Sequence, residues 1–234
     1  MITEDVVAEY AVPVVLVPES TALVIIDLQQ ASASRHRGLG RLLEAQNRSG
    51  EGTYRFERIE RLVVPNTAKL LAFFREHGLA RIFVRLGAQI EGCRDLGRHI
   101  RELEATLGNV EGNPEFEILD ELKPWPGEPI LTKLSISAFT STGIDSLLRN
   151  LNVNSLVFTG VSTSQCVDLT ARDAADRGYG CIIVEDAVAE DRQDFHDATL
   201  AQFIRLFGAV LSTDQVLDSL SQQIAVHPPE QVSR

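Results

Sequence analysis

The sequence has few cysteines, little positive charge and no long apolar run, and each scarcity excludes a class of protein. Its three cysteines, at positions 93, 166 and 181, are far apart and odd in number, which excludes a disulfide framework and a CxxC zinc site. Lysine and arginine number 22 against 33 acidic residues, a net charge of −11, so we expect no nucleic-acid partner. No stretch has the length and apolarity of a transmembrane helix, so we expect no membrane partner. The acidic first residues lack the basic start of a secretory signal, and a cytoplasmic protein is expected.

The segment around Cys166 carries the strongest indication of function. Residues 155–159 form an apolar, β-branched run typical of a buried parallel strand, and Gly160 ends it. From Cys166 onward, small and apolar residues recur at helical spacing until Gly178. A cysteine in the first turn of a helix lies where backbone N–H groups and the helix dipole favour the thiolate, the reactive form of cysteine. The alternative interpretation is a small buried thiol that only packs, as most free cysteines do.

Strand-like and helix-like segments alternate along the chain, which predicts a parallel sheet with helices on both faces. The expected strands are 21–26, 81–85, 130–132, 155–159, 181–184 and 209–211, and the expected helices are 65–77, 95–107, 144–150, 166–177 and 195–207. Residues 29–58 are interpreted as a long excursion with one helix at 39–47, and residues from about 222 as a loose polar tail. We therefore expect a single Rossmann-like three-layer α/β/α domain over residues 1–234, with a core at about 20–215 and a mainly parallel six-stranded sheet.

Three chemically capable residues fall at or just beyond the ends of predicted strands. They are Asp27, Lys133 and Cys166. Parallel sheets bind ligands at the carboxyl ends of their strands, so these side chains can meet at one edge. Taken singly, an aspartate after a strand is usually a cap or turn residue, and a lysine there is usually solvated. Together with the cysteine at a helix start, they form a coherent catalytic set.

These residues and their neighbours resemble the isochorismatase-like cysteine hydrolases, a family that includes nicotinamidases, carbamoylsarcosine amidase, and biuret and ureidoacrylate hydrolases. The resemblance spans about residues 20–215 and is carried by the stretches 22–29, 133–139, 160–167, 174–179 and 184–187. It implies a catalytic triad of Asp27, Lys133 and Cys166. It also implies a cis peptide bond between Val161 and Ser162, which would aim backbone N–H groups, including that of Cys166, at a developing oxyanion.

The chemistry that the resemblance implies needs no cofactor. Cys166 would attack an amide carbonyl as the thiolate, Lys133 would favour that thiolate, and Asp27 would carry the proton to the leaving amine. Nicotinamidases have an Asp-x-His metal motif after the second strand, whereas residues 84–91 here contain no histidine. We therefore expect no metal, and nicotinamide is disfavoured as the substrate.

The segment that follows the first strand departs from the family pattern. Gln29 is present, but Gln30-Ala-Ser-Ala-Ser-Arg-His-Arg-Gly38 replaces the usual aromatic residues. The guanidinium group of arginine donates hydrogen bonds well to carboxylate and carbonyl oxygens, which favours ureido, carbamoyl or biuret-like substrates. The expected substrate-binding residues are Gln29, Arg35, His36, Arg37, Phe139 and Ser162, with Arg35 as the main clamp. The alternative interpretation of residues 32–41 is a lid that only excludes water.

The expected activity is therefore cleavage of a C–N bond in a small polar amide through a thioester acyl-enzyme. Two alternatives stay open: a nicotinamidase-like hydrolase of an aromatic amide, and a catalytically silent family member that binds partners. A second arginine group, Arg55, Arg58 and Arg61, is interpreted as a solvated face, with an anion or carbonyl site as the alternative. We also expect a homo-oligomer, a dimer or tetramer, because the resemblance suggests it and because exposed leucines at 39, 42 and 43 could pack on a neighbour.

Overall fold

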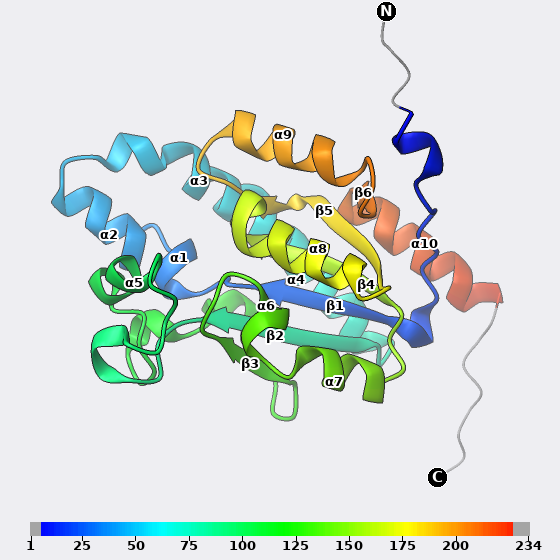
Figure 1. The fold of residues 1–234 in the computed structure, drawn as a ribbon, viewed down its shortest axis with the longest axis horizontal. Helices are drawn as coiled ribbons and strands as arrows, with labels where there is room; N and C mark the ends of the chain where they lie inside the picture. Colours follow the sequence, from blue (N-terminus) through cyan, green and yellow to red (C-terminus); the bar gives the residue numbers. More distant parts are fainter. Residues whose placement is uncertain (1–5, 227–234) are drawn as a thin grey trace, which may run out of the picture.

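The computed structural model describes residues 6–226, which contain a six-stranded, all-parallel sheet covered by helices on both faces (Figure 1). The strand order is β3-β2-β1-β4-β5-β6. The strands are β1 (Thr21–Ile26), β2 (Ala80–Leu86), β3 (Ile130–Lys133), β4 (Ser155–Val161), β5 (Gly180–Ala189) and β6 (Ala209–Leu211). The predicted three-layer α/β/α class with its parallel sheet is confirmed.

The hydrophobic core has two main clusters, one on each face of the sheet. Alternate residues of the central strand β1 point to opposite faces, and all six are buried, as is typical of a parallel strand covered on both sides. One face packs against α4 (Val64–Glu76) and α10 (Thr213–Val226), and the other packs against α7 (Ile144–Asn150), α8 (Asp168–Asp176) and α9 (Gln193–Phe203). The other α-helices are α1 (Gln30–Ala33), α2 (Gly38–Ala45), α3 (Thr53–Arg58), α5 (Arg101–Leu107) and α6 (Ala138–Ser141).

The structure differs from the sequence interpretation at several helices. Residues 29–58 contain three helices, α1, α2 and α3, where one was expected, and α3 continues through a π-helical turn, Ile59–Val63, into α4. Residues 95–100 lie outside an α-helix, and α5 begins only at Arg101. The loose tail expected from residue 222 is wrong for 222–226, which belong to α10, because Val216 and Leu220 anchor that helix on the sheet. The remainder of that expected tail lies outside the described residues.

The leucines expected to be exposed for oligomer contact are half-buried instead. Leu39 and Leu43 pack against the hydrophobic core, and Leu42 is also partly covered. The amphipathic α2 therefore directs these side chains inward, and they supply no free apolar patch.

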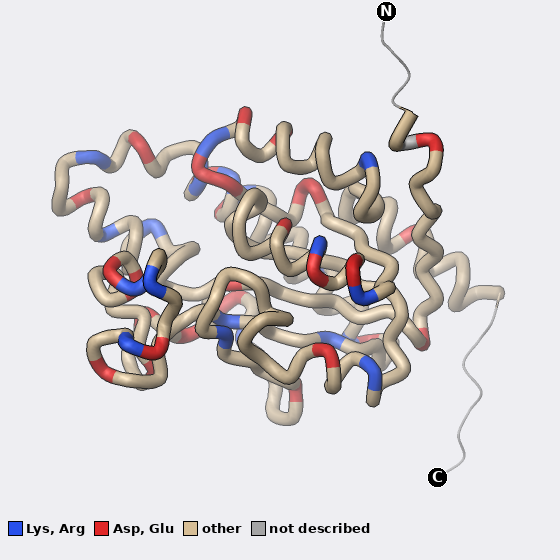
Figure 2. The backbone as a smooth tube through the Cα atoms, in the orientation of Figure 1, with Lys and Arg blue, Asp and Glu red and all other residues tan. Residues whose placement is uncertain are grey.

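Charged residues are interspersed over the helices and loops, with few on the strands (Figure 2). Within residues 6–226, no helix is long and apolar enough to cross a membrane. The carboxyl ends of the strands point toward the side of the molecule where α1, α2 and α5 lie, and this edge holds the candidate site (Figure 1).

Candidate active site

The structure brings Asp27, Lys133 and Cys166 together at the carboxyl edge of the sheet. Asp27 follows β1, Lys133 is the last residue of β3, and Cys166 lies in a π-helical turn, Thr163–Val167, that follows β4 and leads into α8. The Nζ atom of Lys133 lies 2.9 Å from Oδ2 of Asp27 and 3.1 Å from Sγ of Cys166. All three side chains are buried, so they interact in a low-dielectric environment that strengthens charge interactions.

Lys133 is held as an ammonium ion. Burial acts to lower its pKa, but the negative charge of Asp27 and the contact with Cys166 outweigh burial, and the pKa is raised above its usual value. Its three N–H donors point to Asp27, to Cys166 and, at 3.3 Å, to the backbone oxygen of Ser135. Lys133 therefore donates hydrogen bonds and positive charge, and it has no lone pair with which to act as a base.

Cys166 is a thiol in the resting site. Burial and then the charge of Asp27 raise its pKa, Lys133 acts to lower it, and the net result is a pKa of about 12. This differs from the thiolate that the helix start predicted from sequence. Burial of the whole turn and the adjacent carboxylate, neither of which is visible in the local sequence, account for the difference. Nucleophilic attack from this thiol requires a base.

Asp27 presents a free oxygen beside this thiol. Its Oδ2 pairs with Lys133, whereas its buried Oδ1 has no hydrogen-bond partner among the residues that the structure describes. The Asp27 backbone has φ +52°, a left-handed conformation that costs energy for a non-glycine residue and occurs often at functional sites. This conformation turns the chain sharply after β1.

Three buried or half-buried groups brace the turn that carries Cys166. Glu190 accepts hydrogen bonds from the backbone N–H of Ser164 at 2.8 Å and from its hydroxyl at 2.6 Å. The hydroxyl of Thr163 bonds to Nδ1 of His196 at 3.0 Å, and Arg58 donates to Nε2 of the same ring at 3.1 Å. Burial and the charge of Arg58 lower the pKa of His196 to about 4, so the ring is neutral and donates from Nδ1 to Thr163.

A cavity of about 180 Å³ opens onto Cys166 and Asp27. Aliphatic side chains form much of its wall, among them Leu39, Leu86, Ile100 and Ile136. Its polar wall includes Gln29, Ser32, Arg55, Glu104, Asn109, Ser162, Gln165 and Asp191. The size admits a small molecule and excludes a folded or extended polypeptide.

Two of the expected substrate-binding residues line this cavity, and neither has a wholly free side chain. Gln29 donates to the backbone oxygens of Leu86 and Phe116 and accepts from the Leu86 N–H, so its amide is already used for structure. Ser162 accepts a 2.8 Å hydrogen bond from Arg55 and follows Val161 through a cis peptide bond.

The other four expected residues do not line the cavity. Arg35 pairs with Glu60 through two hydrogen bonds, and Arg37 lies 3.8 Å from Glu115. His36 is exposed, and Phe139 is buried in the hydrophobic cluster beneath α8. Of the expected pocket segment 32–41, Ser32 and Leu39 do line the cavity, whereas its arginines pair with Glu60 and Glu115 instead. These placements do not support the clamp that we assigned to Arg35.

Three charged residues of the cavity, Arg55, Glu104 and Asp191, were not among the expected site residues, and Arg55 fits the alternative interpretation of its arginine group rather than a solvated face. Arg55 is 4% exposed and bonds to Ser162, to Asp191 at 3.0 Å and to the backbone oxygen of Ser32. Glu104 is 6% exposed on α5, although the helix is rich in charged residues. The available signal was the spacing of Glu104 from Ile100 and Leu107, which puts an acid on the apolar face of that helix.

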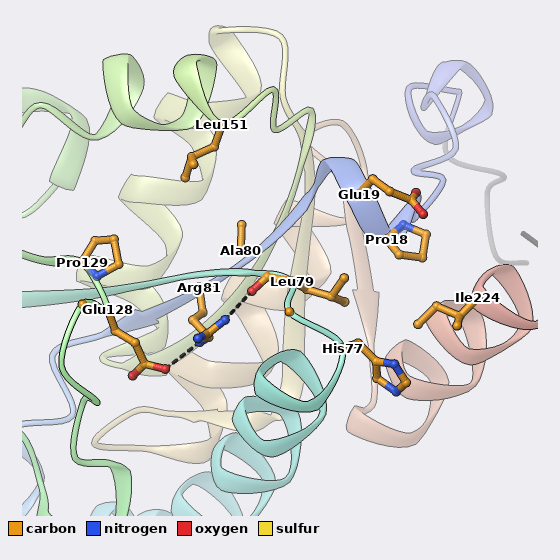
Figure 3. A pocket seen from close by; sticks show the side chains of 12 residues that line it. Pro18, Glu19, His77, Leu79, Ala80, Arg81, Glu128, Pro129, Leu151 and Ile224 are labelled. Carbon is orange, nitrogen blue, oxygen red and sulfur yellow. Dashed lines mark hydrogen bonds and ion pairs between the residues drawn. The ribbon is translucent and has the colours of Figure 1, made fainter. Parts of the chain in front are cut away.

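A larger cavity, of about 550 Å³, lies at the opposite, amino-terminal edge of the sheet (Figure 3). Its acid Glu128 is already paired, since it accepts hydrogen bonds from both Arg75 and Arg81. Figure 3 shows Arg81 directed at Glu128 and at the Leu79 carbonyl rather than into open space. The Arg81–Glu128 pair is therefore not free to bind a ligand, and Glu19, the other acid of the lining, is exposed to solvent.

Comparisons with known proteins agree with the geometry. The Isochorismatase domain model matches residues 21–215. A ureidoacrylate amidohydrolase of Pseudomonas savastanoi pv. phaseolicola is 31% identical over 225 residues, which cover 89% of this chain and 87% of that protein. A maleamate amidohydrolase of Pseudomonas putida is 31% identical over 157 residues, 67% of this chain and 74% of that one. The crystal structure of a cysteine hydrolase from Pseudomonas syringae pv. phaseolicola has the same fold, with a TM-score of 0.72 at 23% identity, over 91% of this chain and 98% of that chain. This chain belongs to the isochorismatase family.

Proposed function

We propose that this protein is an amidohydrolase that cleaves a C–N bond of a small polar amide, with Cys166 as the nucleophile. The observation that carries the proposal is the buried contact of one lysine ammonium with both a carboxylate and a thiol, Asp27 and Cys166. Relatives named ureidoacrylate amidohydrolase and maleamate amidohydrolase support the reaction class, because both names describe hydrolysis of C–N bonds other than peptide bonds.

The first half of the reaction follows from the positions of the three groups. As the substrate carbonyl enters, Oδ1 of Asp27 takes the proton of the Cys166 thiol, and Sγ forms a bond to the carbonyl carbon. Lys133 keeps its proton and stabilises the negative charge that moves from carboxylate to sulfur. The C–N bond then breaks, and Asp27 returns the proton to the leaving nitrogen, which departs as ammonia or an amine. A thioester on Cys166 remains.

The second half uses the same groups in reverse. A water molecule gives a proton to Asp27 and attacks the thioester carbon, the C–S bond breaks, and the proton passes to sulfur to restore the thiol. In both halves the carbonyl oxygen becomes negative. The cis bond between Val161 and Ser162 orients the backbone that enters the Cys166 turn, and we assign the oxyanion contact to backbone N–H groups of this turn, including that of Cys166.

An aromatic amide substrate of the nicotinamidase type is not favoured. Within the part of the chain that the structure describes, no aromatic side chain lines the cavity, and no three His, Cys, Asp or Glu side chains are grouped to hold a metal ion. That the reaction needs no metal or cofactor stays a prediction, as do the cytoplasmic location and the homo-oligomeric state. Light scattering at micromolar concentration tests the last of these.

Ammonia release from a panel of small amides tests the proposed function. The parent enzyme is expected to hydrolyse at least one member of the panel. Cys166→Ala is expected to abolish that activity, whereas the matched variant Cys181→Ala removes another buried thiol and should retain it. Full activity in Cys166→Ala would refute the proposal.

A further inference from the structure

Glu104 is a buried acid in the cavity for which the mechanism above has no use. Its Oε2 atom accepts a 2.7 Å hydrogen bond from Nδ2 of Asn109. Its second oxygen, Oε1, has no hydrogen-bond partner among residues 6–226, and the residue lines the same cavity as Cys166. Oε1 itself is not fully enclosed, so a molecule in the cavity can reach this free acceptor.

The surroundings of Glu104 hold it in place. Nδ2 of Asn109 donates to the backbone oxygen of Leu86 at 2.8 Å as well as to Glu104, so both of its hydrogens are used. Oδ1 of Asn109 accepts from Gln29 at 3.2 Å. Asn109 therefore cannot turn to satisfy Oε1, and the carboxyl group is a pre-positioned acceptor rather than a mobile surface acid.

The charges around the cavity leave Glu104 without a cation. Asp27 is paired with Lys133, and Arg55 is paired with Asp191 at 3.0 Å. Glu104 is the acid of this wall that has only an amide as its partner. Burial raises the pKa of Glu104, and a cationic N–H donor would favour its ionised form and satisfy Oε1 directly. A substrate carboxylate would instead add a further negative charge beside Glu104 and Asp27.

We propose that Oε1 of Glu104 accepts a hydrogen bond from the substrate, and that the substrate is a small aliphatic amide with a second N–H group, an amine nitrogen, in place of a carboxylate facing this wall. The aliphatic character follows from the leucine and isoleucine side chains around the site, and the N–H group follows from Glu104. This inference rests on the proposed amidohydrolase function and specifies its substrate class.

The test compares ammonia release from four amides in the parent enzyme and in Glu104→Gln. The probes are 4-aminobutanamide, its isosteric apolar analogue pentanamide, and two carboxylates, maleamate and ureidoacrylate. We expect the parent to have a higher kcat/KM for 4-aminobutanamide than for the other three. In Glu104→Gln that preference over pentanamide is expected to fall by roughly ten- to a hundredfold, the effect of losing a charge-assisted hydrogen bond.

The control is Glu102→Gln, the same substitution at an exposed position of the same helix, which should leave the ratio between substrates unchanged. A general loss of stability in Glu104→Gln would lower all rates together, so only the ratio reports on recognition. If the parent prefers maleamate or ureidoacrylate, or if Glu104→Gln leaves the ratio unchanged, the inference is overturned while the proposed function stands. No ammonia from 4-aminobutanamide, when another amide of the panel is hydrolysed, would likewise overturn the inference alone, and no ammonia from any amide of the panel would overturn both.

Discussion

The buried pair of Asp27 and Lys133 should be strongly coupled in stability, and this can be measured without knowing the substrate. The two side chains are 5% and 0% exposed, and their charged atoms lie 2.9 Å apart. Lys133→Met removes the ammonium and keeps most of the volume, Asp27→Asn removes the carboxylate charge, and the double variant removes both. The three variants and the parent form a double-mutant cycle.

The expected magnitudes follow from the burial of the pair. Removing one partner of a buried ion pair leaves an uncompensated charge and costs about 3–5 kcal/mol, whereas replacing both partners can be nearly neutral. We therefore expect Lys133→Met to lower the melting temperature by roughly 6–20 °C, at about 2–4 °C per kcal/mol for a chain of this size. The double variant should cost at least about 2 kcal/mol less than the sum of the two single variants.

Urea denaturation at pH 7 measures all four free energies of unfolding. Free-energy changes that simply add, or a Lys133→Met variant within about 1 kcal/mol of the parent, would refute the pairing in solution.

Three further variants test other parts of the site. His196 has a pKa lowered to about 4 by burial and by a neighbouring arginine, so the unfolded state binds more protons between pH 4 and 6.5, and stability should fall as the pH drops through that window. Urea titrations should show that the pH-dependent decrease in the free energy of unfolding is about 2 kcal/mol smaller in His196→Asn than in the parent. An unchanged pH dependence would rule out a buried neutral ring. Arg55→Lys keeps the positive charge but loses the several N–H donors of the guanidinium group, so kcat/KM should fall by about tenfold or more. The control Arg48→Lys, at an exposed position, should match the parent. Equal kinetics in both variants would remove Arg55 from the site. In Gly160→Ala the new Cβ would lie 1.9 Å from the Ile26 oxygen at φ +126°, so denaturation should show a loss of at least about 3 kcal/mol, and a neutral result would contradict this close approach of β4 to β1.

The residues that the structure gathers at the site were predictable where local signals placed them at strand ends. Asp27, Lys133 and Cys166 each follow an apolar run, and a parallel sheet brings such ends to one edge whatever the distance in sequence. Arg35 was predicted to bind the substrate because its neighbours in sequence are polar and cationic, whereas in the structure it pairs with Glu60, 25 residues away. Local composition does not indicate whether an arginine binds a substrate oxygen or a carboxylate that is distant in sequence.

The parts of the site that sequence reasoning missed depend on packing between distant segments. Arg55 reaches the cavity only because α3 lies near the end of β5, where Asp191 is. Glu104 lies on a short helix in which the many charged residues make the apolar face difficult to recognise from the sequence. The same holds for α10, where the buried Val216 and Leu220 are separated by polar residues. In each case the role of the residue depends on which other elements cover one face of its helix. The order of strands and helices along the chain does not predict these contacts.

Trapping the acyl-enzyme tests the central claim most directly. The parent enzyme is mixed with an amide that it hydrolyses, quenched in acid within the first turnover, and analysed by intact-mass and peptide-mass spectrometry. We predict an added acyl mass on the peptide that contains Cys166, absent in Cys166→Ala and present in Cys181→Ala. Turnover in Cys166→Ala, or an acyl mass on Cys93 or Cys181 instead, would contradict the account.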